Sequence, residues 1–107
     1  MKTILEGKKY TTVYGESFHI NVRTTKYGNG RTALISDTID DNGMIEPFAK
    51  MTVNMPDVQL EKDHIIIKDN EENDGVLAFL YAWDIVSAPV KYIMTEHVNY
   101  PVCKLLI

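Results

Sequence analysis

The chain has 107 residues, 45% of them hydrophobic and 24% charged, and its formal net charge at pH 7 is −4. These values exclude extensive disorder and predict a single domain over residues 1–107 that needs no metal or other cofactor to fold. A membrane span is also excluded, because the longest apolar run, residues 76–83, falls far short of the roughly 20 residues required.

The first half of the chain predicts antiparallel strands joined by tight turns. The candidate strands cover residues 18–24, 31–36 and 48–55. On the first of them, Phe18, Ile20 and Val22 alternate with polar residues and are expected to face inward. Turns rich in glycine and asparagine separate the strands at residues 27–30 and 41–43, so the first two strands should form a hairpin.

The second half predicts a short strand, one helix and two final strands. The strands cover residues 65–67, 90–98 and 100–107, and residues 4–14 are expected to add one or two more. Apolar residues recur at helical spacing from Val76 to Val86, before Pro89. The helix begins either at a capping box of Asp69 and Glu72 or at residue 73 or 74. The predicted class is α+β, an antiparallel curved sheet of five to seven strands with one helix packed against it.

Cys103 is the only cysteine, so an intrachain disulfide is impossible, and its apolar neighbours predict a buried thiol. Charged residues interrupt the N-terminal apolar residues, so no export signal is expected. Both features predict a cytoplasmic protein.

Charge is divided along the chain. Residues 1–31 have a balance of +4, whereas residues 37–84 have a balance of −9. If the fold keeps these segments apart, the surface has an acidic side and a basic side that would steer charged partners. The alternative is that strand pairing mixes the two segments into an ordinary solvated surface.

No motif indicates catalysis or a metal site. Asn70, Glu72 and Asp74 alternate ahead of Gly75 as in a calcium loop, but Tyr81 stands where the bidentate glutamate would be. The histidines are scattered without zinc spacing, and no serine lies in a nucleophile motif. We therefore predict a protein that is not an enzyme and binds neither metal nor cofactor.

Nucleic-acid binding is a secondary hypothesis. Basic and aromatic residues are interleaved on presumed strands of the first half. They are Lys2, Lys8, Lys9, Arg23, Lys26, Arg31, Tyr10, Tyr14 and Tyr27. Because only six cations contribute and the whole chain is acidic, this face would at most add weak binding.

Four segments together resemble a bacterial family of unknown function carried on conjugative elements, plasmids and phages of Gram-positive bacteria. They are residues 22–27, 52–57, 67–77 and 101–105. The resemblance spans most of residues 17–107. It implies a small accessory protein of a mobile element, and such proteins frequently inhibit host defence.

The resemblance and the acidic charge together predict an inhibitor that binds a host defence protein, such as an anti-CRISPR protein acting on an RNA-guided nuclease. An acidic surface could occupy the cationic channel that holds nucleic acid. The predicted partner-binding residues are Asp69, Glu71, Glu72 and Asp74. The alternative is an accessory interaction protein for transfer or maintenance of the element, with weak nucleic-acid binding.

Overall fold

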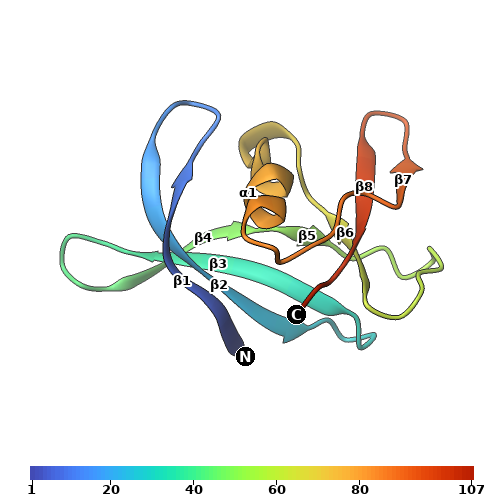
Figure 1. The fold of residues 1–107 in the computed structure, drawn as a ribbon, viewed down its shortest axis with the longest axis horizontal. Coiled ribbons are helices and arrows are strands. Elements are labelled where there is room, and N and C mark those ends of the chain that lie inside the picture. Colours follow the sequence, from blue (N-terminus) through green and yellow to red (C-terminus); the bar gives the residue numbers. More distant parts are fainter.

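The computed structural model describes all residues, 1–107, and arranges them in two four-stranded antiparallel sheets with one short helix packed against both (Figure 1). The first sheet has the order β1-β2-β3-β4, with β1 at Lys2–Thr11, β2 at Ser17–Lys26, β3 at Thr32–Ile39 and β4 at Ile45–Lys50. The second has the order β5-β6-β8-β7, with β5 at Thr52–Val53, β6 at His64–Ile67, β7 at Lys91–Met94 and β8 at Asn99–Lys104. A 3₁₀ turn, η1 (Glu71–Asn73), precedes helix α1 (Val76–Ala82).

The prediction of mostly antiparallel sheet with a single helix is confirmed, but the prediction of one sheet with five to seven strands is wrong. The reason lies at Met51, where the predicted strand 48–55 divides into β4 and β5. Met51 is fully buried; its N–H donates to the Leu34 carbonyl (2.9 Å), and its carbonyl accepts from the Lys68 N–H (2.9 Å). The chain therefore leaves the first sheet and enters the second at this residue.

The predicted hairpin of the first two strands is confirmed. β2 and β3 pair antiparallel with Val22 opposite Ser36, and Ile20 and Val22 are fully buried. The turn closes through a hydrogen bond from the Tyr27 N–H to the Arg31 carbonyl (2.8 Å), and Gly30 adopts a φ of 86°, which favours glycine.

Helix α1 ends earlier than the apolar spacing predicts. Asp84 has a φ of 57° and turns the chain out of the helix, so Ile85 and Val86 are buried from the non-helical segment that follows. Val86 forms an isolated antiparallel bridge with Leu105. The seven-residue helix α1 falls short of the length that a membrane-spanning helix requires, and the structure has no longer helix.

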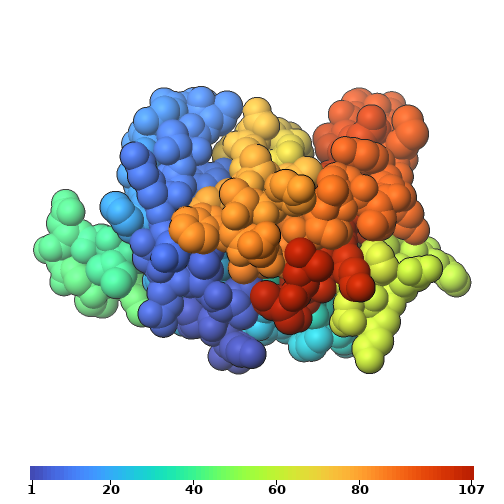
Figure 2. Space-filling model, in the orientation of Figure 1, coloured from blue at the N-terminus to red at the C-terminus, as the bar shows by residue number.

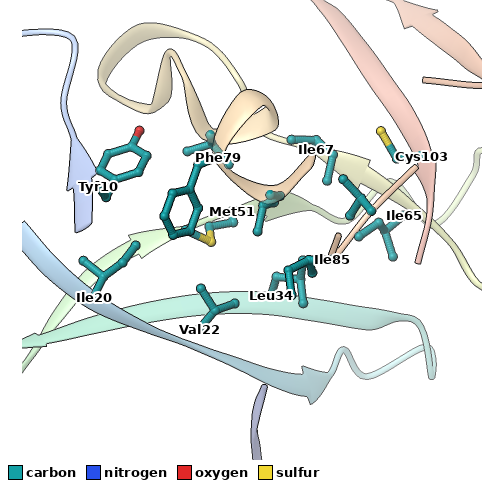
Figure 3. Packing of buried hydrophobic residues seen from close by; sticks show 13 residues of the cluster. Tyr10, Ile20, Val22, Leu34, Met51, Ile65, Ile67, Phe79, Ile85 and Cys103 are labelled. Carbon is teal, nitrogen blue, oxygen red and sulfur yellow. The ribbon is translucent and has the colours of Figure 1, made fainter. Parts of the chain in front are cut away.

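The core lies between the two sheets, under the helix, and gathers thirteen buried residues (Figure 3). Leu34 from β3, Leu80 from α1 and Ile67 from β6 are each fully buried. Phe79 meets the Tyr10 ring edge to face with 5.3 Å between ring centroids. Helix and both sheets therefore share one hydrophobic cluster.

The prediction of a buried Cys103 is confirmed, and we expect its thiol to be unreactive in the folded protein. Burial first, and Asp69 second, raise the pKa of the Cys103 thiol to about 11. At pH 8 only about one thiol in a thousand would be ionised, against about one in four for an ordinary cysteine. A disulfide reagent should therefore react at least about 100-fold faster in guanidinium than in buffer, and equal rates would contradict this expectation.

Candidate protein-binding site at the acidic segment

The acidic segment, residues 69–74, connects β6 to α1 and contains η1. It lies on the surface between the β1–β2 hairpin and the β7–β8 hairpin (Figures 1 and 2). The structure thus brings the four predicted partner-binding residues into one turn. Their side chains, however, have different surroundings.

Asp69 holds the start of the helix. Its Oδ1 accepts hydrogen bonds from the backbone N–H groups of Gly75 and Leu77, both at 3.0 Å. The predicted capping box with Glu72 is wrong, as is a helix start at residue 73 or 74, because the N-cap residue is Gly75. Gly75 has a φ of 102°, a backbone conformation that glycine adopts readily because it has no side chain. This turn brings the Gly75 and Leu77 N–H groups, which have no acceptor within the helix, to the Asp69 carboxylate.

Asn73 anchors the segment, a role that the sequence pattern does not indicate. It is 3% exposed, and its Nδ2 donates to the carbonyls of Lys50 (2.7 Å) and Lys68 (3.2 Å). These carbonyls flank the corner at Met51, so one amide ties the acidic segment to both sheets. An asparagine between acidic residues predicts an exposed loop, and no local signal distinguishes this one.

Glu72 is partly engaged within the segment. Its carboxylate forms an ion pair with Lys68 at 3.0 Å, on the exposed surface. A hydrogen bond from its own backbone N–H and then the Lys68 ammonium lower the pKa of the Glu72 carboxyl. It therefore stays charged, with one cation already beside it.

Glu71 and Asp74 are the exposed acids of the segment that have no cation partner. Glu71 has a φ of 55°, a conformation uncommon for residues other than glycine. It is held there by the hydrogen bond from the Asp74 N–H to its carbonyl (3.1 Å) and by the anchored Asn73 between them. The carboxylates of Glu71 and Asp74 thus lie on a turn whose shape is held by the hydrogen bonds of the buried Asn73.

Tyr10 lies beneath the segment, and we expect its replacement by phenylalanine to stabilise the protein. Its hydroxyl is buried without a hydrogen-bond partner, and Figure 3 shows it pointing away from the hydrophobic cluster. Burial, then Asp69 and Asp74, raise the pKa of the Tyr10 hydroxyl.

Tyr10→Phe removes this unpaired group and keeps the ring, so the free energy of unfolding should rise by about 1 kcal/mol. Urea unfolding of both proteins measures the change. A loss of stability would mean that the hydroxyl has a bonding partner in solution.

The basic residues of the first half are partly used inside the protein. The Arg23 guanidinium pairs with Asp37 at 2.6 Å and also donates to Thr3. Arg31 donates to the carbonyls of Met55 (2.7 Å) and Val58. Two of the six cations proposed for nucleic-acid binding are therefore structural, and binding by the remaining face stays a prediction.

The Arg23–Asp37 pair makes stability depend on pH. Hydrogen bonding from Arg23 lowers the pKa of Asp37, with Asn21 Nδ2 a second donor at 2.9 Å. Because the pKa of Asp37 is lower in the folded protein than in the unfolded chain, its ionised carboxylate stabilises the fold at any pH above the unfolded-state pKa of about 4. This contribution is lost as the pH falls through the folded-state pKa. Between pH 6 and pH 2, the stability advantage of the wild type over Asp37→Asn should therefore shrink, as measured by urea unfolding. A stability difference between wild type and Asp37→Asn that stays the same from pH 6 to pH 2 would contradict this prediction.

Carboxylate side chains outnumber lysine and arginine side chains by fifteen to eleven. Only two of the fifteen carboxylates, those of Asp37 and Glu72, lie within 4.0 Å of an arginine or lysine side chain, and that of Glu61 lies 3.9 Å from the His64 ring. Nowhere do three His, Cys, Asp or Glu side chains gather as they would around a metal ion. Most carboxylates are therefore free to interact with a positively charged partner.

No family model matches the chain, and neither a curated protein nor a solved structure matches it. The resemblance to the family carried on mobile elements therefore stays an expectation from the sequence.

Proposed function

We propose that the protein is a non-enzymatic inhibitor that binds a cationic surface of a host defence protein, with the nucleic-acid channel of an RNA-guided nuclease as its target. The observation that carries the proposal is the fixed presentation of Glu71 and Asp74. Both carboxylates are exposed and lack a cation, on a turn that Asp69 and Asn73 hold in place.

Rigidity favours such binding. A partner that meets a preformed turn does not have to order it, so less of the interaction free energy is lost on association. The excess of carboxylates over cations in the whole chain, fifteen to eleven, adds long-range attraction to a basic channel. In this proposal Asp69 acts by positioning, while Glu71 and Asp74 contact the partner and Glu72 exchanges Lys68 for a cation of the partner.

The proposal assigns the protein to the bacterial cytoplasm, where RNA-guided nucleases act. The resemblance to a family of mobile elements supports this choice of partner, because such elements gain from blocking host defence. Occupying the basic channel would exclude nucleic acid, which that channel holds through its backbone charge.

Charge reversal at the segment tests the proposal. The variant Glu71→Lys with Asp74→Lys should lose binding to a guide-loaded RNA-guided nuclease by roughly 100-fold, whereas wild-type binding should weaken as salt is added. The matched control is Asp57→Lys with Glu96→Lys, which changes net charge equally at two exposed acids outside the segment.

Isothermal titration calorimetry at two salt concentrations measures the affinities, and thermal unfolding checks the fold of each variant. If the control variant loses as much affinity as the segment variant, net charge and not this site is responsible. Absence of wild-type binding, together with capture of only element-encoded transfer proteins in a pull-down, would favour the accessory role.

A further inference from the structure

A second exposed feature is the β3–β4 finger, residues 39–46, which projects from one end of the first sheet beyond the core (Figures 1 and 2). Ile39, Met44 and Ile45 are 59%, 64% and 62% exposed. Ile39 and Ile45 are cross-strand partners, so their side chains lie side by side on one face of the hairpin. Three large apolar side chains at a projecting tip contribute nothing to the core and indicate a contact surface.

The finger has a fixed shape, which Asp40 determines. The Asp40 N–H donates to the Met44 carbonyl (2.9 Å), and its carbonyl accepts from the Gly43 N–H (3.0 Å). Its Oδ1 accepts from the N–H groups of Asn42 and Met44, both at 2.9 Å. The Asp40 carboxylate is therefore occupied by hydrogen bonds within the turn. These bonds hold the hairpin closed, with Ile39, Met44 and Ile45 exposed on it.

Two free carboxylates flank the apolar side chains. Asp41 at the tip and Glu46 on β4 are exposed and have no cationic neighbour within 4.0 Å. A second finger packed symmetrically on the first would place like charges together, which disfavours self-association through this face. The surface instead fits a partner that is apolar and positively charged.

An apolar groove extends the same surface. It has a volume of about 500 Å³, and its walls include Ile35, Ile45, Pro47 and Ala49. Asp37 and Lys50 also line it, and the Asp37 carboxylate is already paired with Arg23. The finger and the groove thus form a continuous, mostly apolar surface on which the unpaired carboxylates belong to the finger.

Grooves that hold single-stranded nucleic acid combine these two properties. Their cations follow the phosphate backbone, and their aromatic side chains form platforms on which bases stack. Carboxylates of a protein partner can form ion pairs with the cations of such a groove, and its exposed isoleucine and methionine side chains can pack on the aromatic side chains.

We infer that the β3–β4 finger docks into a groove for single-stranded nucleic acid on the partner protein. The inference rests on the proposed function and specifies which surface of the nuclease is occupied. Asp41 and Glu46 take the place of phosphates, and Ile39, Met44 and Ile45 take the place of bases.

Displacement of a fluorescent oligothymidylate from a guide-loaded RNA-guided nuclease tests the inference by anisotropy. Wild-type protein should displace the oligonucleotide. Ile39→Thr with Ile45→Thr should need roughly tenfold more protein for half displacement, and Asp41→Asn with Glu46→Gln should also weaken displacement. The control Tyr92→Thr with Met94→Thr removes two side chains of similar exposure from β7 and should act as wild type.

The outcomes separate the two proposals. If both finger variants displace the oligonucleotide like wild type while Glu71→Lys with Asp74→Lys does not, the finger inference falls and the proposed function stands. Wild-type binding to the nuclease without displacement overturns the finger inference and the choice of the nucleic-acid channel as the target, but leaves binding to the nuclease in place. Absence of any wild-type binding overturns both. The charge variant keeps the test decisive if the threonine variant fails to fold.

Discussion

Replacing Asp69 by alanine is expected to lower the free energy of unfolding by about 2–4 kcal/mol, the value of two hydrogen bonds to a charged acceptor. Both bonds come from the helix start, at Gly75 and Leu77, and both are 3.0 Å long. The helix has only seven residues, so it has little stability of its own to offset the loss. Urea unfolding followed by circular dichroism measures the change.

Two further variants show what the loss means. Asp69→Asn keeps an acceptor oxygen without the charge and should lose less than alanine does. Asp74→Asn lies in the same segment, but no hydrogen bond of its side chain is found, so its stability should stay within about 0.5 kcal/mol of wild type. Equal losses for Asp69→Ala and Asp74→Asn would contradict the capping role.

Replacing Asn73 by alanine is expected to cost about 2–4 kcal/mol as well. Its amide is the donor to the carbonyls of Lys50 and Lys68 at the corner between the sheets. Without it, two carbonyls beside a buried position lose a partner, and each unsatisfied group costs about 1–3 kcal/mol. The same unfolding experiment measures the loss.

The control for this prediction is Asn99→Ala, because Asn99 is exposed and no side-chain hydrogen bond is found for it. It should change stability by less than about 0.5 kcal/mol. Water entering the corner in the Asn73→Ala protein would restore part of the loss. A cost as small as that of the control would show that the amide does not hold the corner.

Asp69 and Asn73 hold the acidic segment in shape, so substitutions there would change both folding and binding. Neutralising all four predicted residues together would remove the helix cap with the free carboxylates, so lost binding could follow from lost structure. Charge reversal at Glu71 and Asp74 alone leaves the hydrogen bonds of Asp69 and Asn73 in place. Charge reversal at these two residues therefore tests binding without disturbing the hydrogen bonds that hold the fold.

Local patterns in the sequence determined the hairpin and the approximate place of the helix. Alternation identified Ile20 and Val22 as inward residues, because successive side chains of a strand point to opposite faces. Apolar spacing placed a helix over the segment that follows Gly75, although the predicted start ahead of Val76 and the predicted end near Val86 are both wrong. These features depend on near neighbours along the chain, so a single sequence is enough to predict them.

Only the tertiary structure decided where the sheets divide and which acids are free. Met51 turns the chain from one sheet to the other through bonds to Leu34 and Lys68, which are distant in sequence. Asp69 reaches forward past the turn to cap the helix, and Asn73 bonds to Lys50. Hydrogen-bond partners far apart in the chain leave no local pattern, because the type of a polar residue does not reveal which backbone group the fold will bring beside it.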